Sequence, residues 1–278
     1  MIAAASSQSA AVSMKSPAVS KHNIKGGAPW PPASSRLDGI AAATWPAAST
    51  DRFHLHHLWL PLVGFATVLA LLALLQGDAW WADRLYAWQG GHWALRNAYL
   101  TQTLIHLGGR DLSTAAWLAV ALAWLVAWRR PALARLRWPL AYLALATLLA
   151  TAAVAWLKSW SNMDCPWDLL RYGGDRPYVG LLALRPVGLS RGVCFPAGHA
   201  SGGYAWMSLY FFALTLRPRL RYWGLAVGVG AGLLFGFSQQ LRGAHFLSHD
   251  VWTAALCWMT VLGVYLLFRR HLPLAPRA

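Results

Sequence analysis

The chain has 278 residues with a formal net charge of +15, and 57% of the residues are hydrophobic while only 12% are charged. A soluble globular domain has about 25% charged residues, so this composition excludes an ordinary soluble protein and is typical of a membrane protein. The positive charge is clustered between long apolar runs, and it therefore gives no reason to expect a nucleic-acid partner.

Residues 1–52 are rich in Ala, Ser and Pro and carry no periodic apolar pattern. Such a segment has too little apolar surface to form a core. We therefore expect residues 1–52 to be a disordered cytoplasmic tail.

Six apolar runs follow this tail, each close to the length of about 20 residues that a membrane-spanning helix needs. A buried core helix of a soluble protein is the alternative for any single run, but six in succession, separated by basic clusters, favour membrane spans. Residues 53–271 are thus predicted to form an all-α, integral membrane six-helix bundle. The runs are Leu58–Gln76, Leu112–Trp128, Trp138–Leu157, Ser201–Leu216, Tyr222–Ser238 and Val251–Phe268.

The basic clusters lie before the first run and after the second, fourth and sixth runs. Cytoplasmic loops carry an excess of Lys and Arg, so all four clusters fall on the cytoplasmic side if every run spans. We expect both termini to be cytoplasmic, with residues 272–278 as a short basic tail. The segments after runs one, three and five then face the opposite side.

Three outer segments result from this topology. Gly77–Asp111 is rich in Trp and Tyr, which favour the membrane interface, and it is expected to hold one or two interfacial helices. Lys158–Pro196 is polar and rich in Gly and Pro, and the third segment, QQLRGAHFLSHD, is short.

Ionisable side chains gather at the outer ends of the last four runs. Because helix ends on one side of a bundle can converge, we expect these side chains to form one cluster at a single membrane depth. They are Lys158, His199, His245, His249 and Asp250.

The stretch CFPAGHASGGYAW places His199 among small residues where an apolar run begins. A helix N-terminus directs free backbone N–H groups at an anion, and small residues such as Gly198 would let a phosphate approach it, with His199 as proton donor. Close packing of a glycine-rich helix start against a neighbouring helix is the alternative, and the local pattern leaves both open.

Three motifs in this order resemble those of the type 2 phosphatidic acid phosphatase superfamily, which also includes the vanadium haloperoxidases. KSWSNMDCP from Lys158 is similar to Lys-x6-Arg-Pro, PAGH from Pro196 to Pro-Ser-Gly-His, and SQQLRGAHFLSHD from Ser238 to Ser-Arg-x5-His-x3-Asp. The resemblance implies that Lys158 binds phosphate and that His245 attacks phosphorus to form a phosphohistidine. It also implies that His199 protonates the leaving alkoxide and then acts as the base for water.

The chain departs from the family pattern at three phosphate donors: Cys165 and Gln239 stand where the motifs have arginine, and Ala197 replaces the serine. An arginine contacts phosphate through two N–H groups, which a point charge does not easily replace. The guanidinium is expected from elsewhere, and the candidates are Arg171, Arg176 and Arg242.

His249 occupies the position of the motif aspartate, and Asp250 follows one residue later. The motif register favours His249 as the residue that orients His245. A carboxylate commonly holds the second ring nitrogen of a nucleophilic histidine, which favours Asp250. The H-x3-H spacing also puts His245 and His249 on one helical face, where Asp250 could complete a metal site. Because no further ligand set is evident, neither a metal nor a cofactor is predicted.

Cys165 and Cys194 flank the second outer segment, where the expected topology places both in an oxidising compartment. A thiolate at Cys165 would repel phosphate, so we expect a disulfide between Cys165 and Cys194, with two unrelated cysteines as the alternative. Cys257 lies in the sixth run and is expected to be packed as a small hydrophobic residue.

The predicted function is that of a membrane lipid phosphatase, which hydrolyses a phosphomonoester or pyrophosphate on the periplasmic or outer face of a bacterial inner (plasma) membrane. Its partners would be the bilayer and a phosphorylated lipid: polyprenyl pyrophosphate, phosphatidic acid, phosphatidylglycerophosphate or a lipid A phosphate. A phosphotransferase with the same phosphohistidine, and a non-catalytic lipid-phosphate binder that has lost the motif arginines, are the alternatives. A haloperoxidase fits a six-helix membrane core poorly, and the oligomeric state is left open.

Overall fold

The computed structural model describes residues 47–181 and 183–273. Residues 1–46 of the predicted tail, and residues 274–278 at the C-terminus, lie outside the described residues. The described part is all-α, and no strand occurs within it. The predicted fold class is thus confirmed.

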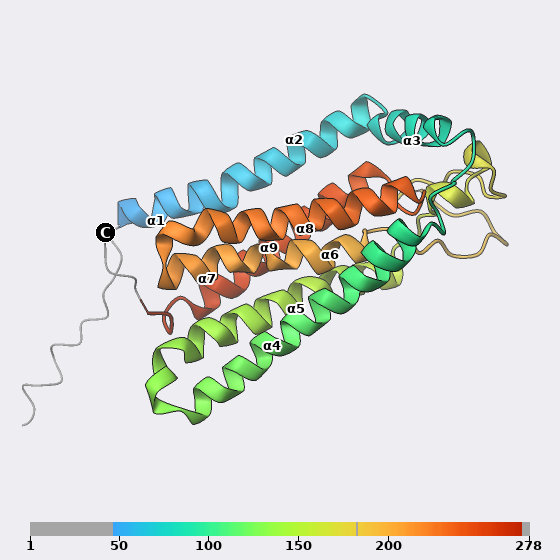
Figure 1. Cartoon of the computed structure of the whole chain (residues 1–278). Helices are drawn as coiled ribbons and strands as arrows, with labels where there is room; N and C mark the ends of the chain where they lie inside the picture. The colour runs from blue at the N-terminus through green and yellow to red at the C-terminus, as the bar shows by residue number, and fades with distance from the viewer. Residues whose placement is uncertain (1–46, 182, 274–278) are drawn as a thin grey trace, which may run out of the picture. The chain divides into compact units, whose positions relative to one another are not determined.

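The helices follow the apolar runs in chain order, and several are joined by short π- or 3-10-helical turns (Figure 1). They are α1 (Ala47–His54), α2 (Leu60–Leu74), α3 (Gly77–Trp88), α4 (Gly109–Arg129), α5 (Arg137–Trp160), α6 (Gly198–Tyr204), α7 (Ser208–Leu216), α8 (Arg221–Leu241) and α9 (Leu247–Phe268). A π-helical turn, η2 (Leu55–Trp59), joins α1 to α2, and a second, η3 (Tyr99–Gly108), runs directly into α4.

Five continuous helical stretches in the described part are long and apolar enough to cross a membrane. The prediction of an integral membrane protein is borne out by them. The run Ser201–Leu216 is helical too, but the 3-10 turn η7 (Ala205–Met207) divides it into α6 and α7. The five are Asp51–Leu74, Tyr99–Arg129, Pro131–Trp160, Pro218–Leu241 and Leu247–Phe268.

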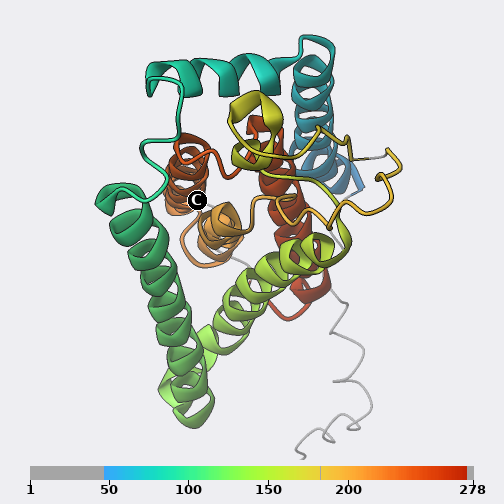
Figure 2. The ribbon, with the colours of Figure 1, turned by 90° about the vertical axis from the view of Figure 1, so that its right-hand side faces the viewer.

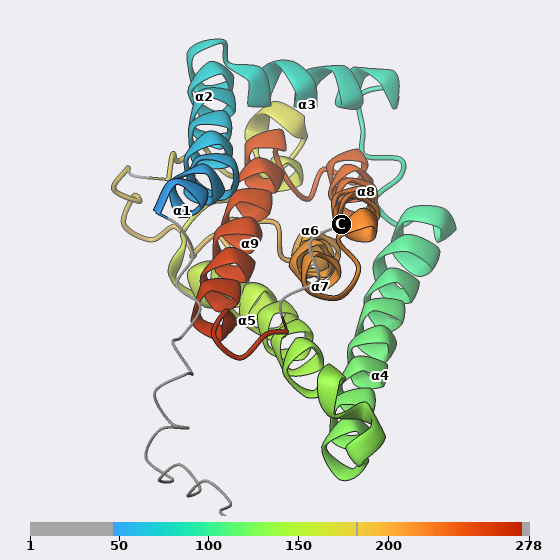
Figure 3. The same cartoon turned by 90° about the vertical axis from the view of Figure 1, so that its left-hand side faces the viewer.

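The first outer segment is shorter than predicted. It was expected to extend to Asp111, but the second long helix already begins at Tyr99. The polar residues Thr101, Gln102 and His106 interrupt the apolar pattern of η3, so hydropathy placed the helix start too late. The segment contains one helix, α3, which lies across the end of α2 (Figure 3).

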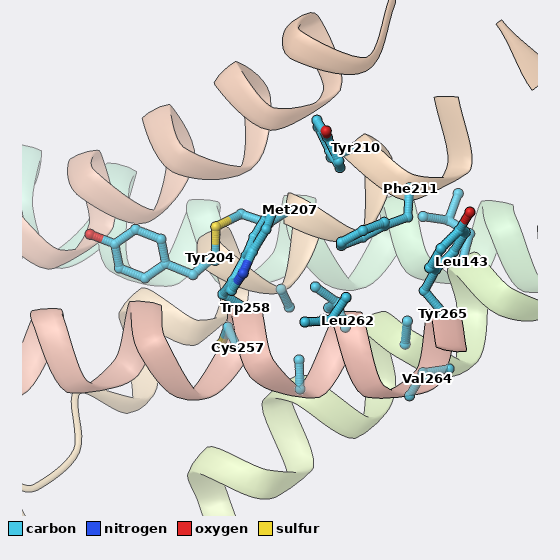
Figure 4. Close-up of a cluster of buried hydrophobic side chains, with 14 of the residues drawn as sticks. Leu143, Tyr204, Met207, Tyr210, Phe211, Cys257, Trp258, Leu262, Val264 and Tyr265 are labelled. Atoms are coloured by element: carbon cyan, nitrogen blue, oxygen red, sulfur yellow. The ribbon is translucent and has the colours of Figure 1, made fainter. Parts of the chain in front are cut away.

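The centre of the bundle is built from α5, α6, α7, α8 and α9. Its main hydrophobic cluster includes the fully buried Phe211 and Cys257 (Figure 4), and Cys257 has a free thiol as predicted. α4 meets α5 at one end and diverges from it toward the other (Figure 2).

α6 and α8 touch through their backbones because glycines face each other. A Cβ atom added at Gly203 would lie 2.3 Å from the backbone nitrogen of Gly232. No real Cβ comes so close to another backbone atom, so only glycine permits this contact. The close contact holds the N-terminal turn of α6, which carries His199, against the C-terminal half of α8.

The segments that follow runs one, three and five contact one another at one end of the bundle, which we call the site end. Asp78 of α3 accepts a hydrogen bond from the backbone N–H of Ser248 at 2.8 Å, and Trp167 donates its backbone N–H to the Gly243 carbonyl at 2.9 Å. At the opposite end of α5, where this helix begins, Trp138 stacks on His271 with ring centroids 4.4 Å apart.

Candidate functional site

Four of the predicted site residues lie at helix ends or in the turn between two helices. Lys158 lies in the last turn of α5, His199 is the second residue of α6, His245 lies between α8 and α9, and His249 is the third residue of α9. Since α6 packs against α5, α8 and α9, these ends meet at the site end.

Lys158 lies against the start of α6. Its Nζ donates to the Pro196 carbonyl at 3.4 Å, and its Cδ is 3.6 Å from the point where a Cβ of Gly198 would be. No carboxylate pairs with Lys158 within residues 47–181 and 183–273. Its positive charge is therefore available for an anion at the Gly198 backbone.

His245 and His249 contact each other, with their Nδ1 atoms 3.4 Å apart. His245 is 7% exposed and His249 is fully buried. Burial, followed by the charge of Lys158, holds the pKa of His245 well below the ordinary value of 6.5, although a hydrogen bond with the Cys194 backbone opposes this. His245 is thus neutral at pH 7 and keeps a nitrogen lone pair, as a nucleophile must.

Asp250 points away from His245 and packs against α8. Its carboxylate accepts a hydrogen bond from the Gln240 side-chain amide and lies against Gly236, where an added Cβ would be 2.7 Å from the Asp250 Cγ. Trp81 in turn donates to Gln240 at 2.7 Å. Of the two candidate partners, His249 is the one in contact with His245, and the His245–His249–Asp250 metal site considered above does not form.

His199 lies between two aromatic rings. His106 of η3 packs edge-on at 4.6 Å between ring centroids, and Phe235 of α8 stacks at 4.7 Å. Burial lowers the pKa of His199 to about 4, and the nearby His106, Arg242 and Arg110 lower it further. The Nε2 atom of His199 is buried without a hydrogen-bond partner in the protein, so it is free to contact a ligand.

Arg242 is buried beside His199. Its Nη1 donates to Gln239 Oε1 and to His106 Nδ1, each at 3.0 Å, and its Nε donates to the Arg96 carbonyl at 2.7 Å. No carboxylate is paired with Arg242 in the described part of the chain. Gln239, at the position of a motif arginine, thus anchors the arginine that lies one turn later.

Arg176 and Arg171 are bound in ion pairs. Arg176 Nη1 lies 2.7 Å from Asp164 Oδ1, which also accepts from Arg185 at 2.8 Å. Arg171 pairs with Asp83 of α3 through two hydrogen bonds. Arg242 thus lies beside His199, whereas Arg176 is paired with a carboxylate.

Cys165 and Cys194 form a disulfide in this structure, with Cα atoms 5.1 Å apart and a sequence separation of 29. Next to it, the Ser161 hydroxyl donates to the Phe195 carbonyl, and the Cys194 N–H donates to the Met163 carbonyl at 3.0 Å. These links join the chain after Lys158 to the chain before His199.

One group of three candidate metal ligands occurs among the described residues, and it consists of Cys165, Asp168 and Cys194. Two of its three ligand atoms are the sulfurs of the disulfide, which no longer carry thiolate charge. This group therefore does not fit a metal ion while the bond is intact.

A cavity of about 530 Å³ opens beside His199, between α4, α5 and α6. His106 and Arg110 line it, and the sequence analysis assigned neither of them to the site. Both were placed in the first outer segment because the membrane helix was predicted to start after Asp111. Their spacing of four residues, which puts them on one face of a helix, is the signal that could have found them.

A model of the PAP2 superfamily matches residues 139–273. This range includes Lys158, His199, His245 and the helices α5 to α9 that hold them. No curated protein and no solved structure matches the chain.

Proposed function

We propose that the chain is an integral membrane lipid phosphatase that forms a phosphohistidine at His245, because the model that matches residues 139–273 is that of the PAP2 superfamily, a family of phosphatases. The family supports phosphatase activity, and the five long apolar helices support a protein that lies in a membrane. The lipid substrate, the intermediate and the roles of individual residues are the content of the proposal.

One observation carries it: Lys158 and Arg242, which have no carboxylate partner in the described part, lie around two histidines that burial keeps neutral. Cations held inside a protein without counter-charges favour an anion as ligand. A phosphate satisfies this need, and a neutral His245 beside it supplies the nucleophile.

The proposed first step forms a bond between His245 Nε2 and phosphorus and breaks the bond from phosphorus to the leaving oxygen. For Nε2 to hold the lone pair, Nδ1 must carry the hydrogen and donate it to His249 Nδ1. Binding of the phosphate anion favours the protonated form of His199, which then gives its proton to the leaving oxygen. In the second step His199 takes a proton from water, whose oxygen attacks phosphorus and releases His245.

The cavity supports a lipid as the substrate. It extends from His199 along α4 and α5, where Trp117, Leu148 and Ala155 form part of its wall. Apolar walls that lead from a phosphate site into a bundle of membrane helices suit an acyl or prenyl chain. The distribution of Lys and Arg supports a position of this end on the periplasmic or outer face.

Two alternatives keep the same site. A phosphotransferase would pass the phosphoryl group from His245 to an acceptor other than water. A non-catalytic lipid-phosphate binder is favoured by one observation, namely that Cys165, Ala197 and Gln239 replace three phosphate donors of the motifs.

The test is phosphate release from a panel of lipid phosphates by the purified protein in detergent. The wild type should release phosphate, and His245→Ala should reduce the rate by at least about a thousandfold, because the nucleophile is lost. His92→Ala is the control, since His92 is exposed and outside the site. Labelled substrate should also give an acid-labile, base-stable phosphoenzyme that His245→Ala does not form. Unchanged turnover by His245→Ala would exclude His245 as the nucleophile.

A further inference from the structure

His245 lies in the short connection between α8 and α9. α8 ends at Leu241 and α9 begins at Leu247, so that residues 242–246 join the two helices. A helix leaves its first N–H groups and its last C=O groups without partners inside the helix. Because the connection is short, the groups that bind these two helix ends also determine where the His245 ring lies.

α3 contacts both of these helices. It runs from the end of α2 across α9 and α8 at the site end (Figure 2). Asp78, Trp81, Leu85 and Gln89, the last of which directly follows α3, are spaced three or four residues apart and therefore share one side of the helix. Leu85 and Gln89 are buried, so this side faces the bundle.

Asp78 caps the start of α9. Its Oδ1 accepts the backbone N–H of Ser248 at 2.8 Å, and its Oδ2 accepts the Ser248 hydroxyl at 2.5 Å. Ser248 is the second residue of α9, whose N–H is one that an N-cap side chain ordinarily binds. The residue at the N-cap position is Phe246, which has no side-chain oxygen. Asp78 thus supplies from α3 the cap that the sequence of α9 lacks.

Gln89 caps the end of α8. Its Nε2 donates to the Leu241 carbonyl at 2.9 Å, which is one of the carbonyls that the helix itself leaves unpaired. Its Oε1 accepts the Leu95 backbone N–H at 2.9 Å, and because an N–H can only donate, this contact fixes the amide with Nε2 toward Leu241. Trp81 adds a second link to the same end of α8 through Gln240, at 2.7 Å.

We propose that Asp78 and Gln89 are positioning residues, which hold His245 in line with the phosphorus by capping the two helix ends on either side of it. The proposal rests on the phosphatase function proposed above. Lys158 and Arg242, the cations proposed to bind the phosphate, are held by other contacts. Loss of a cap should therefore slow the attack by His245 more than it weakens phosphate binding.

The experiment is a single turnover of a labelled lipid phosphate, with the purified protein in saturating excess. The first-order rate constant for release of the dephosphorylated lipid then measures the attack by His245 on bound substrate, and it does not depend on the fraction of the protein that is folded. A residue that only stabilises the fold would leave this constant unchanged. The inhibition constant of inorganic phosphate reports binding at the same site.

Asp78→Ala should lower the rate constant by about tenfold to a hundredfold, since a misplacement of about 1 Å can cost about a hundredfold. The inhibition constant of phosphate should stay within about threefold. Asp78→Asn should keep the rate constant within about threefold of the wild type, because Asn is as good an N-cap as Asp and can still accept the Ser248 N–H. Gln89→Leu, which loses the donor to Leu241, should also lower the rate constant.

Asp83→Ala is the matched control. Asp83 is a carboxylate on the same helix, but it pairs with Arg171 in the segment between α5 and α6 and caps neither α8 nor α9. Its loss should leave the rate constant within about threefold.

An unchanged rate constant in Asp78→Ala overturns the proposal, and so does an equal loss in Asp83→Ala. If Asp78→Ala does not fold, Gln89→Leu decides from the other helix end, where an unchanged constant also overturns it. A wild type that releases no phosphate from any lipid phosphate overturns the proposed function itself.

Discussion

The contact between His245 and His249 replaces the histidine–carboxylate pair that the motif resemblance implies. A carboxylate orients the ring and also stabilises the positive charge that develops on it, whereas a neutral imidazole does only the first. His249 is fully buried. At the scale of single residues, variants of His249 therefore test whether it positions the proposed nucleophile, His245.

We expect His249→Ala to lower kcat by about tenfold to a hundredfold with KM little changed, because His249 acts through His245 rather than on the phosphate. His249→Asp should retain more activity than His249→Ala, since a carboxylate can accept the same hydrogen from His245. Asp250→Asn should have the smaller effect, because Asp250 contacts Gln240 instead. Steady-state kinetics on one lipid phosphate check this order, and a larger loss for Asp250→Asn than for His249→Ala would contradict it.

Acidification should destabilise the fold. The pKa values of His199, at about 4, and of His245 lie below the ordinary value of 6.5, so between about pH 4 and 6.5 the unfolded state binds more protons than the folded state. The contribution of these two histidines to stability is therefore complete above pH 6.5 and is lost as the pH falls through this window. Arg110, Arg242 and His106 beside His199, and Lys158 beside His245, all oppose protonation.

The measurement is the thermal unfolding midpoint of the purified protein in detergent at pH 7.5 and pH 5. The midpoint should be lower at pH 5. A double variant with His199→Gln and His245→Gln should lose less on acidification, because neither replacement titrates. An equal loss in the wild type and the double variant would assign the effect to other groups.

At the scale of elements, the start of α6 combines the two explanations that its sequence left open. Gly198 lies against Lys158 and the cavity, so its lack of a side chain serves the site. Gly203, five residues later, lies against the backbone of α8 and serves packing. The same glycine-rich stretch thus brings His199 to the site and fixes its helix.

The Cys165–Cys194 bond should stabilise the segment that connects α5 to α6. Closing a loop of about thirty residues is worth on the order of 3–4 kcal/mol in the chain-entropy model. A variant with both Cys165→Ser and Cys194→Ser should have a lower unfolding midpoint and lower activity, because the Lys158 and His199 helix ends are then less firmly held. Mass spectrometry of the unreduced protein checks the bond directly. Free thiols at both positions would exclude it.

At the scale of the whole protein, the site end joins the three segments that follow runs one, three and five. The basic clusters lie in the other connections and near the termini. If basic loops stay in the cytoplasm, the proposed phosphate site would face the opposite side of the membrane and both termini would be cytoplasmic.

Two single-cysteine substitutions test this topology: Val187→Cys at the site end and Ala134→Cys in the turn between α4 and α5, both at exposed positions. A membrane-impermeant maleimide added to intact bacterial cells should label Val187→Cys, and should label Ala134→Cys only after permeabilisation. Cys257 is buried and should contribute no background. Labelling of Ala134→Cys from outside would reverse the assigned orientation.

The sequence by itself determined the helical class, the approximate positions of the membrane helices, and Lys158, His199 and His245 as residues of one site end. Hydropathy, charge distribution and motif spacing are all properties of the linear sequence. A long apolar run in a membrane has few alternatives to a helix. Only the tertiary structure decided that His249 rather than Asp250 touches His245, that Arg176 is bound to Asp164, and that His106 and Arg110 line a cavity at His199. The first of these outcomes depends on the local fold between α8 and α9, and the second on the fold of the segment between α5 and α6. The third depends on the approach of His106 and His199, which are more than ninety residues apart in the chain, and a local sequence pattern records none of these.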